Sequence, residues 1–409
     1  MIVKNIAYLY VIQLLRLCLP LAMLSILTRV LTGPQYSVYV YTLASAAWLS
    51  IFVEYGFNVS ATRRVAASAG PATTRTIIIE TQSAKWMLAG LSLVFLALAT
   101  TQSSVCSAHQ EWAVCAWLLG VMTGLTPTYY FQGTSNLRIV AQLEVAGGLL
   151  TFGSVMLLVR NSEDFWRLSL TLIGVRLLIW QILDHQMFTN GKLRYGAVFT
   201  IRPGLSALKD GWKIFLVQAA ASLYTSFNLV LLGGVSTAYA VAVYGSSERL
   251  IRAGLAFIAQ ATSAIFPKLT AMKAADPAGL EKARRMSLMV FTLVSAACLP
   301  VVYWMAPVIS EFLFSNKFPD VPKVIRIMAL VIPAIAINNV LAFHFLVVDH
   351  QEHTLNWVVF AAVPISLVSG YFLSREYGAA GMATAWVAVE WFVSISLAVI
   401  IYFRQKRLQ

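Results

Sequence analysis

The chain has 409 residues, of which 59% are hydrophobic and only 11% are charged. Soluble globular domains carry about 25% charged residues, so this composition excludes a water-soluble or disordered protein and indicates one that crosses a membrane many times. The net charge of +13 comes from 30 Lys and Arg against 17 Asp and Glu. In a soluble chain this excess would favour nucleic-acid binding, so its placement along the chain decides its meaning.

Twelve apolar stretches of about 20 residues are each long enough to cross a bilayer as a helix. Turn-forming residues such as Asn190-Gly191 and Asp276-Pro277 separate them. In chain order the stretches are Ile6–Thr28, Tyr36–Phe57, Ser83–Thr101, Trp112–Phe131, Ile139–Val159, Phe165–Phe188, Ile214–Gly233, Ala238–Phe266, Ser287–Phe314, Val324–Val348, Thr354–Ser374 and Gly378–Phe403. The sequence therefore predicts an all-α polytopic membrane protein with about 12 transmembrane helices.

A basic segment at residues 189–213 divides these stretches into two sets of six. The residues that follow the first span, Val30–Gly33, resemble Leu231–Gly234 after the seventh. Two halves related about an axis along the membrane normal are a recurrent plan of transporters. We therefore expect an N-terminal six-helix lobe at 1–188, a basic cytoplasmic linker at 189–213 and a C-terminal six-helix lobe at 214–409, around a central cleft.

Lysine and arginine are concentrated on one side of the predicted bundle. With the N-terminus in the cytoplasm, nineteen of the thirty lie in cytoplasmic segments, six in external segments and five inside spans. Because cytoplasmic loops of membrane proteins are enriched in Lys and Arg, this bias places both termini in the cytoplasm. Most of the basicity thus reflects topology and not nucleic-acid binding.

Five arginines lie inside predicted spans, where a charge needs a partner or a water-filled cavity: Arg16, Arg176, Arg249, Arg252 and Arg326. Helix rise places Arg16 about 15 Å and Arg252 about 21 Å along their spans, near the midplane, and Arg249 shares a face with Arg252. These three would form a cationic centre that suits phosphate or diphosphate. Arg176 and Arg326 are expected to snorkel towards an interface.

Four carboxylates in or near the spans leave alternatives open. Glu248 lies four residues before Arg252 and would pair with it, and Glu390 lies deep in the last span, where it could neutralise another arginine. For each arginine, pairing with a carboxylate of the protein is therefore the alternative to binding substrate. Glu54 and Asp184 lie near the cytoplasmic ends of their spans and are candidates for proton or monovalent-cation coupling, with interfacial exposure as the alternative.

The remaining patterns indicate no chemistry of their own. No Ser-His-Asp arrangement, phosphate-binding glycine loop or pair of catalytic carboxylates can be placed on the chain, so neither an enzyme nor a cofactor is predicted. His350, Glu352 and His353 beside Asp349 raise the alternative of a metal site, but a solvated loop is the preferred interpretation. The Gly-x-x-x-Gly pattern at 120–124 predicts close helix packing inside the protein.

Five segments spread along the chain form a set that is more specific than any one of them. They are Leu31–Tyr36, Glu54–Ala66 with its Tyr-Gly-Phe and Ser-Ala-Thr-Arg sequences, Pro127–Gly133, the region Lys209–Lys268 with Val-Tyr-Gly and Glu-Arg-Leu, and Ile337–Val340. In this order they resemble the Wzx-type O-antigen flippases, the polysaccharide transporter family of the multidrug/oligosaccharidyl-lipid/polysaccharide exporter superfamily. Two departures are Tyr129, where the family has Trp, and Ser135, where it usually has Glu.

The resemblance implies a flippase that moves undecaprenyl-diphosphate-linked oligosaccharide repeat units, of O-antigen or a related surface polysaccharide, from the cytoplasmic to the periplasmic leaflet of the bacterial inner membrane. It also implies alternating access. The expected partners are this lipid-linked glycan, membrane lipids, the polysaccharide polymerase and the chain-length regulator, and no nucleic acid.

Candidate site residues follow from the buried charges and this implied activity together. Those expected to bind the diphosphate and sugars are Arg16, Arg29, Arg249, Arg252, Tyr224, Asn228 and Asn338, with helix packing as the alternative role of the last three. Those expected to serve in coupling or gating are Glu54, Arg63, Arg64, Asp184, Glu248 and Glu390.

Two other functions are weighed against the flippase. A multidrug exporter of the same superfamily would favour a carboxylate-rich cavity for organic cations, whereas the midplane of this chain is rich in arginine. A membrane-embedded polysaccharide polymerase would carry its active residues on a large periplasmic loop. The external loops predicted here are about ten residues or shorter.

Overall fold

The computed structural model describes residue 15 and residues 18–102, 108–314 and 317–408. These residues form helices joined by turns and short loops, with no strand among them, which confirms the predicted all-α class. Within them, seven helices are long and apolar enough to cross a membrane, or eight if the bent pair Ile201–Thr225 and Asn228–Val235 is one span. The total of twelve spans stays a prediction, and Arg16 lies outside the described residues.

The chain divides into two compact units, Met1–Ser222 and Leu223–Gln409. The division falls in the last turn of α11 (Ile201–Thr225), a helix that begins inside the basic segment predicted as a linker. The organisation into two six-helix lobes therefore stays a prediction, and each unit is described on its own below.

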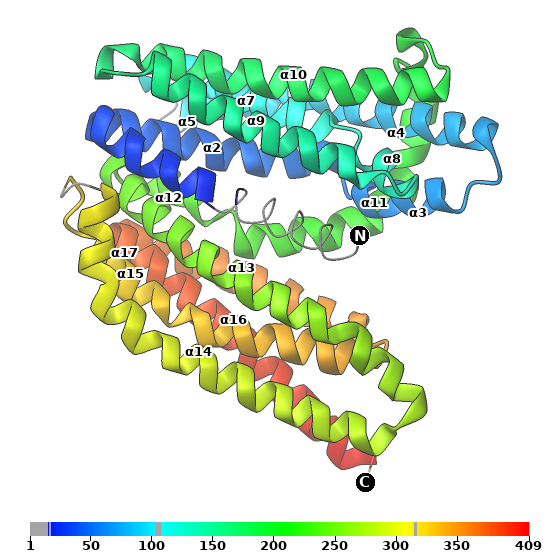
Figure 1. The fold of residues 1–409 in the computed structure, drawn as a ribbon, viewed down its shortest axis with the longest axis vertical. Coiled ribbons are helices and arrows are strands. Elements are labelled where there is room, and N and C mark those ends of the chain that lie inside the picture. The colour runs from blue at the N-terminus through cyan, green and yellow to red at the C-terminus, as the bar shows by residue number, and fades with distance from the viewer. Residues whose placement is uncertain (1–14, 16–17, 103–107, 315–316, 409) are drawn as a thin grey trace, which may run out of the picture. The chain divides into compact units, whose positions relative to one another are not determined.

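Unit 1 is a bundle in which α7 and α10 are each packed against two other long helices. Its elements are the helix Cys18–Val30, α2 (Gly33–Glu54), α3 (Phe57–Ala66), α4 (Pro71–Leu91), α5 (Leu93–Gln102), α7 (Gln110–Leu125), α8 (Thr128–Gly133), α9 (Leu137–Leu158), η1 (Ser162–Asp164), α10 (Phe165–Gly191), η2 (Tyr195–Val198) and most of α11. The helix α2 packs along α7, which also contacts α10, and α10 contacts α9 (Figure 1). The short helices α3 and α8 pack on each other at one end of this bundle.

The segment Leu31–Tyr36 forms the start of α2. The hydroxyl of Thr32 accepts from the Gln35 backbone N–H (3.4 Å), and the Gln35 side-chain oxygen accepts from the Thr32 N–H (3.1 Å). This reciprocal capping box satisfies two N–H groups that have no partner inside the helix. Pro34 lies in the first turn, where its missing N–H leaves no hydrogen bond unmade. The turn chemistry of this motif therefore fixes where α2 begins.

The Gly-x-x-x-Gly pattern lies on the face of α7 that touches α2. A Cβ on Gly120 would stand 2.8 Å from the Ala46 carbonyl oxygen, and one on Gly124 would stand 2.5 Å from Val53 Cβ. Both distances are below van der Waals contact, so only glycine allows the two helices to approach this closely. The predicted role of this pattern in packing within the protein is confirmed.

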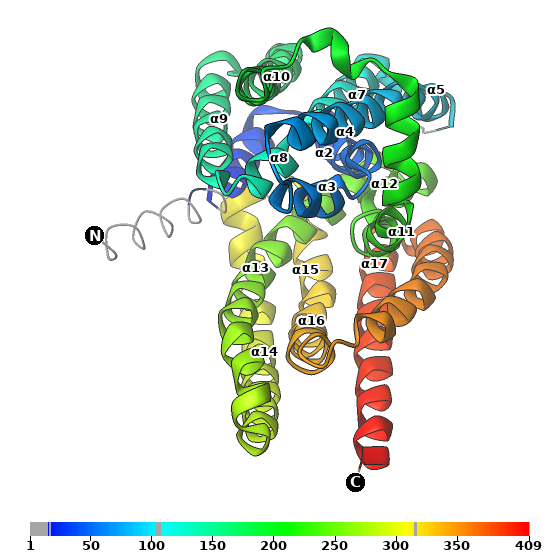
Figure 2. The ribbon, with the colours of Figure 1, turned by 90° about the vertical axis from the view of Figure 1, so that its right-hand side faces the viewer.

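Unit 2 is built from long helices around α15 and α16. Its elements are α12 (Asn228–Val235), α13 (Ala238–Ala275), α14 (Pro277–Phe314), α15 (Val321–Ala329), α16 (Val331–Asn339), the π-helical segment η3 (Val340–Val347) and α17 (Glu352–Leu408). Figure 2 shows α13 beside α14, and α15 contacts both of them as well as α17. The long element α17 is two helices that meet at Gly378 (φ 56°, ψ −129°). A residue with a side chain rarely adopts this φ, and the break agrees with the two spans predicted there.

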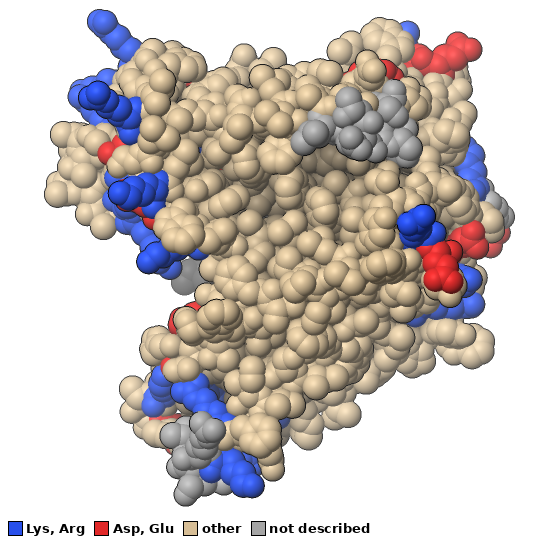
Figure 3. All heavy atoms as spheres, turned by 180° about the vertical axis from the view of Figure 1, so that it is seen from behind, with Lys and Arg blue, Asp and Glu red and all other residues tan. Residues whose placement is uncertain are grey.

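Charged side chains in each unit gather at the ends of the long helices. On the face shown in Figure 3, an uncharged band lies between these ends. Large apolar side chains on the long helices are exposed, among them Leu157, Trp304, Phe312 and Phe372. An uncharged band with exposed apolar side chains is what a protein presents to the hydrocarbon core of a bilayer.

Candidate functional site

Unit 2 contains a polar network built around Arg252 of α13. We call it the C-terminal polar network, and its members are Glu248, Arg252, Asn338, Trp386, Glu390 and Ser394. The Arg252 Nη2 lies 2.6 Å from the Glu248 Oε1, and Nε donates to the same oxygen at 2.9 Å. The guanidinium carbon stands 5.1 Å from the centre of the Trp386 ring, a cation–π contact. A buried carboxylate and an aromatic ring thus hold Arg252, while part of its side chain stays exposed.

A second carboxylate, Glu390 on α17, lies on the other side of Trp386. The Trp386 indole N–H donates to Glu390 Oε1 (3.2 Å), and the Asn338 Nδ2 donates to Oε2 (2.9 Å). The Ser394 hydroxyl donates to Asn338 Oδ1 (2.7 Å), which fixes the orientation of that amide. Glu390 is 3% exposed and, within the described residues, has neutral hydrogen-bond donors but no ion pair. A buried carboxylate held in this way is a candidate for binding a proton.

The network lies at a break between two helices. The chain bends by 56° between α11 and α12, and the Arg252 Nη2 donates to the carbonyl of Thr225, the last residue of α11. A cation at the carboxyl end of a helix is stabilised by the helix dipole. On the other side of the bend, Asn228 begins α12 and is 3% exposed. Its Nδ2 and the hydroxyl of Tyr244 are buried and have no hydrogen-bond partner within the described residues.

The structure brings together most of the site residues predicted in the second half of the chain. Glu248, Arg252, Asn338 and Glu390 are members of the network itself. Asn228 lies at the adjoining helix break. The charges of Arg252 and Glu390 both act electrostatically on the side chain of Tyr224. Arg249 is half-buried on α13, three residues before Arg252.

Unit 1 contains a second polar network, centred on Lys85 of α4. We call it the N-terminal polar network, and its members are Gln82, Lys85, Thr126, Glu144, Arg176 and Asp184. Lys85 is fully buried; its Nζ donates to the carbonyl of Thr126 (3.1 Å) and lies 5.1 Å from the centre of the Tyr129 ring. No carboxylate of the described residues lies within 4.0 Å of it, although Glu54 and Asp184 are close enough to act on its charge.

Thr126 joins Lys85 to the rest of this network. Its hydroxyl accepts from Arg176 Nη2 (2.8 Å), and Arg176 Nη1 makes an ion pair with Glu144 (2.8 Å). The Arg176 side chain is only 15% exposed, so the prediction that it snorkels to an interface is wrong. A carboxylate and a hydroxyl accept from its two terminal nitrogens instead, while its buried Nε has no partner within the described residues. Asp184 is half-buried, and its Oδ1 lies 3.5 Å from Gln82 Nε2.

The predicted Glu54–Ala66 segment folds into the turn between α2 and α3. The Glu54 carboxylate accepts from the backbone N–H groups of Gly56 (3.0 Å) and Asn58, and from Gln218 Nε2 (3.0 Å). Glu54 is thus the acidic cap of α3, and its part in coupling stays a prediction. The motif at Pro127–Gly133 forms α8, and the Thr62 hydroxyl donates to the Tyr129 carbonyl (3.2 Å). Two segments of the motif set therefore pack against each other.

The other candidates in unit 1 lie apart from the Lys85 network. Arg64 pairs with Glu80 of α4 at 2.5 Å, and this ion pair joins α3 to α4. Arg63 is exposed near the end of α3, and Arg29 is exposed near the end of the helix Cys18–Val30. The structure does not bring these residues together with Lys85.

Lys85 is a buried cation that the sequence alone does not identify. Because the third apolar stretch begins at Ser83, the sequence predicts Lys85 at the cytoplasmic end of a span. In the structure α4 begins at Pro71, so Lys85 lies well inside a longer helix. The first turns of α4 contain polar residues, which lower the local hydropathy. The apolar stretch in the sequence therefore begins later than the helix does. An earlier helix start at Gly70-Pro71 was the available signal.

The loop around Asp349 does not form a metal site in the structure. Asp349 Oδ1 lies 2.8 Å from Arg284 Nη2 and 3.6 Å from Lys273 Nζ. Arg284 is buried and its Nε also donates to the carbonyl of His344 (2.8 Å) in the π-helical segment. Within the described part of the chain, no three His, Cys, Asp or Glu side chains are grouped to hold a metal ion.

Residues 2–273 match the family model described as polysaccharide biosynthesis protein. A putative O-antigen transporter of Shigella dysenteriae is 24% identical over 93% of this chain and 94% of its own length. A putative O-antigen transporter of Escherichia coli (strain K12) is 22% identical over 96% of this chain and 94% of its own.

Solved structures of two transporter groups share the fold. The lipid II flippase MurJ in an inward closed conformation has a TM-score of 0.73 at 12% identity, covering 98% of this chain and 88% of its own. A multidrug resistance MATE family transporter in an inward-facing conformation has a TM-score of 0.67 at 14% identity, covering 94% of each chain. At these identities the likeness concerns the fold alone.

Proposed function

The chain belongs to the polysaccharide biosynthesis protein family, and from this premise we propose that it flips undecaprenyl-diphosphate-linked oligosaccharide repeat units from the cytoplasmic to the periplasmic leaflet of the bacterial inner membrane. The family match and the two O-antigen transporters confirm the resemblance on which the prediction rested. The chain is a multi-pass membrane protein and a transporter, not an enzyme. The two six-helix lobes of the proposal would alternate access to the two leaflets.

The observation that carries this proposal is the placement of Arg252 at the helix break of unit 2. Transporters bind ionic groups of their substrates where a helix is interrupted near the middle of the membrane. Arg252 uses Nε and Nη2 for Glu248 and Thr225, and within the described residues its Nη1 makes no hydrogen bond. Its side chain is 39% exposed although Glu248 and Trp386 hold it in place. A fixed guanidinium with a free N–H group suits a diphosphate oxygen.

Neutral side chains beside Arg252 offer hydrogen bonds that suit the hydroxyl groups of a glycan. The buried Asn228 amide and Tyr244 hydroxyl are further hydrogen-bond groups at the same break. The polyprenyl chain can remain in the bilayer, so only the charged and hydroxylated part of the substrate needs a polar path. In this proposal Arg249, three residues before Arg252 on α13, extends that path, and the diphosphate-binding roles of Arg29 and Arg16 stay predictions from the sequence. Glu390, Asp184 and Glu54 are the coupling candidates for a proton or a monovalent cation.

The proposal is tested in a strain that makes the matching surface polysaccharide and lacks this gene. We expect complete lipid-linked repeat units to accumulate on the cytoplasmic side, and the intact gene to restore surface polysaccharide. Single repeat units attached to the lipid A core would instead show a polymerase, and would overturn the proposal. Normal surface polysaccharide in the deletion strain would overturn it as well.

The role of Arg252 is tested by Arg252→Ala and by the double variant Glu248→Gln/Arg252→Ala. A charge-assisted hydrogen bond contributes about 1.5–3 kcal/mol, so we expect both variants to lose transport by about tenfold or more. The single change leaves the Glu248 charge unpaired and lowers stability by about 1–3 kcal/mol, while the double variant recovers most of that loss. Recovery of transport together with stability would show that Arg252 is only a structural partner. Lys213→Gln, on the exposed face of α11, is the matched control.

A further inference from the structure

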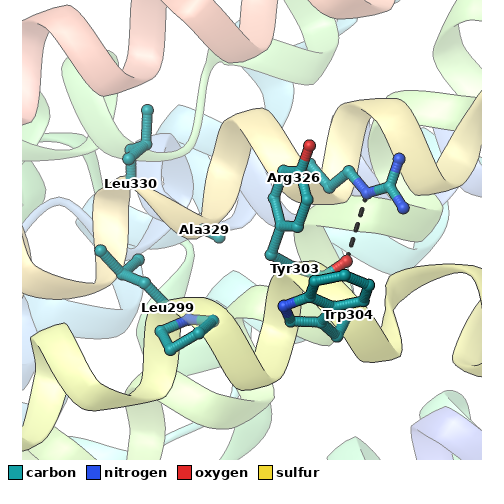
Figure 4. A pocket seen from close by; sticks show the side chains of 7 residues that line it. Leu299, Tyr303, Trp304, Arg326, Ala329 and Leu330 are labelled. Carbon is teal, nitrogen blue, oxygen red and sulfur yellow. Dashed lines mark hydrogen bonds between the residues drawn. The ribbon is translucent and has the colours of Figure 1, made fainter.

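The outer face of unit 2 carries an open pocket between α14 and the helices α15 and α16. Its volume is about 300 Å³, and its lining includes Leu299, Tyr303, Trp304, Arg326 and Leu330. Figure 4 shows the aliphatic side chains of Leu299 and Leu330 at one end, and Tyr303, Trp304 and Arg326 at the other. One end of the pocket is therefore apolar, and the other is aromatic and cationic.

A proline in α14 leaves a carbonyl group free to hold Arg326 at this pocket. Pro307 has no N–H, so the carbonyl of Tyr303, four residues earlier, loses its helical donor. Arg326 Nε donates to that carbonyl instead (3.2 Å), and its guanidinium carbon lies 4.6 Å from the centre of the Tyr303 ring. The side chain is thus fixed against α14. That it reaches a membrane interface stays a prediction.

Arg326 has no ion pair within the described part of the chain, where no carboxylate lies within 4.0 Å of it. Among the same residues its Nε alone makes a hydrogen bond, so the two outer nitrogens keep their donors for another group.

The surroundings of the pocket are apolar and exposed. Only 11% of the most apolar stretch of α14 is buried, and Trp304 is 78% exposed. Indole and phenol rings favour the interface region of a bilayer, next to the headgroups. An uncompensated arginine beside such rings attracts a negative headgroup.

We propose that this pocket binds one anionic phospholipid of the surrounding bilayer, with its phosphate on Arg326 and an acyl chain along Leu299 and Leu330. The separation of cationic and aliphatic ends matches the division of a phospholipid into headgroup and chain. The site belongs to the protein's boundary lipids. It is distinct from the C-terminal polar network and does not depend on the transported substrate.

The test is native mass spectrometry of the delipidated full chain in detergent, with phosphatidylglycerol or phosphatidylcholine of identical acyl chains. One charged headgroup near a basic side chain gains about 1 kcal/mol, so we expect the first phosphatidylglycerol to bind about fivefold more tightly than phosphatidylcholine. Arg326→Gln should remove this preference and Arg326→Lys should keep most of it. The exposed Arg375→Gln is the matched control and should leave the preference unchanged.

The same experiment contains the outcomes that overturn the proposal. Equal binding of both phospholipids, or an unchanged preference in Arg326→Gln, would show that Arg326 serves only the Tyr303 carbonyl. Displacement of phosphatidylglycerol by an equimolar polyprenyl diphosphate would assign the pocket to the substrate. A lowered Tm would show that Arg326→Gln fails to fold. The test would then rest on Arg326→Lys, whose loss of the preference for phosphatidylglycerol over phosphatidylcholine would overturn the proposal if its Tm is unchanged. Because no transport is measured, failure here leaves the proposed function untouched.

Discussion

Three cations in this protein donate to main-chain carbonyls where helices end, bend or become π-helical. Lys85 donates to Thr126, just after α7, and Arg252 donates to Thr225, at the end of α11. Arg284 donates to the carbonyl of His344 in the π-helical segment. The carboxyl end of a helix carries partial negative charge, which adds to the ion pairs of Arg252 with Glu248 and of Arg284 with Asp349 and stabilises Lys85 where no carboxylate of the described residues lies within 4.0 Å. Structural and functional roles therefore meet in the same side chain.

A substitution at Lys85 can separate a structural role from a role in transport. Replacing a buried charge by an apolar side chain of similar volume is often neutral or stabilising, because the cost of desolvation disappears. We expect Lys85→Met to keep or raise the Tm of the purified protein and to reduce transport by about tenfold or more. Scanning fluorimetry and surface polysaccharide are the two measurements.

The exposed Lys213→Met, which should change neither quantity, is the control for Lys85→Met. A fall in Tm with unchanged transport per folded molecule would mean that Lys85 only caps the end of α7. Both the Tm and the surface polysaccharide must be measured, because a folding defect alone also lowers surface polysaccharide.

At the scale of elements, close contacts between helices rest on glycine and on the motif segments. The α2–α7 contact requires Gly120 and Gly124, while α3 and α8 bring the Glu54–Ala66 and Pro127–Gly133 segments together. These segments are thus packing elements first. They place Glu54 and Tyr129 near Lys85 and so build the surroundings of the N-terminal polar network.

A pair of glycine substitutions tests the α2–α7 contact. A Cβ at Gly124 would lie 2.5 Å from Val53 Cβ, so Gly124→Ala should lower stability by about 1–3 kcal/mol through overpacking. Gly153, inside α9, has open space around its Cβ position, so Gly153→Ala should raise stability by about 0.5–1 kcal/mol through helix propensity. Thermal unfolding in detergent measures both. Equal effects of the two substitutions would contradict the close approach of α2 and α7.

At the scale of the whole molecule, charge lies at the ends of the helices in each unit, with an uncharged band between (Figure 3). The positive excess that the sequence assigns to the cytoplasmic side predicts the orientation of that band in the membrane. The loop at Val159–Asn161, between α9 and α10, is then periplasmic, and the segment after α10 is cytoplasmic.

Reporter fusions test this orientation directly. Alkaline phosphatase fused after Asn161 should be active, because the enzyme folds only in the periplasm, and a fusion after Gly191 should be inactive. Green fluorescent protein at the same two positions should give the reverse result, which controls for expression. The opposite pattern at both positions would overturn the inferred topology, and with it the cytoplasmic termini.

The sequence by itself determined the properties that depend on neighbouring residues. The apolar stretches give the all-α membrane class, the turn residues Thr32-Gly33-Pro34 precede a predicted helix as α2 shows, and the separate spans Thr354–Ser374 and Gly378–Phe403 agree with the break in α17. Hydropathy and turn chemistry are local, so they can be read without a fold. They also identified Arg252, Glu248 and Glu390 as buried charges, since any charge inside an apolar stretch stands out.

Only the tertiary structure decided which polar groups meet. Glu390 lies more than a hundred residues from Arg252, yet Trp386 stands between them in one network, and Asn338 reaches Glu390 from a third helix. Lys85 and Arg176 gained their partners through packing around Thr126. A buried charge must find some partner, but the sequence does not say which one, because that choice depends on how distant helices pack.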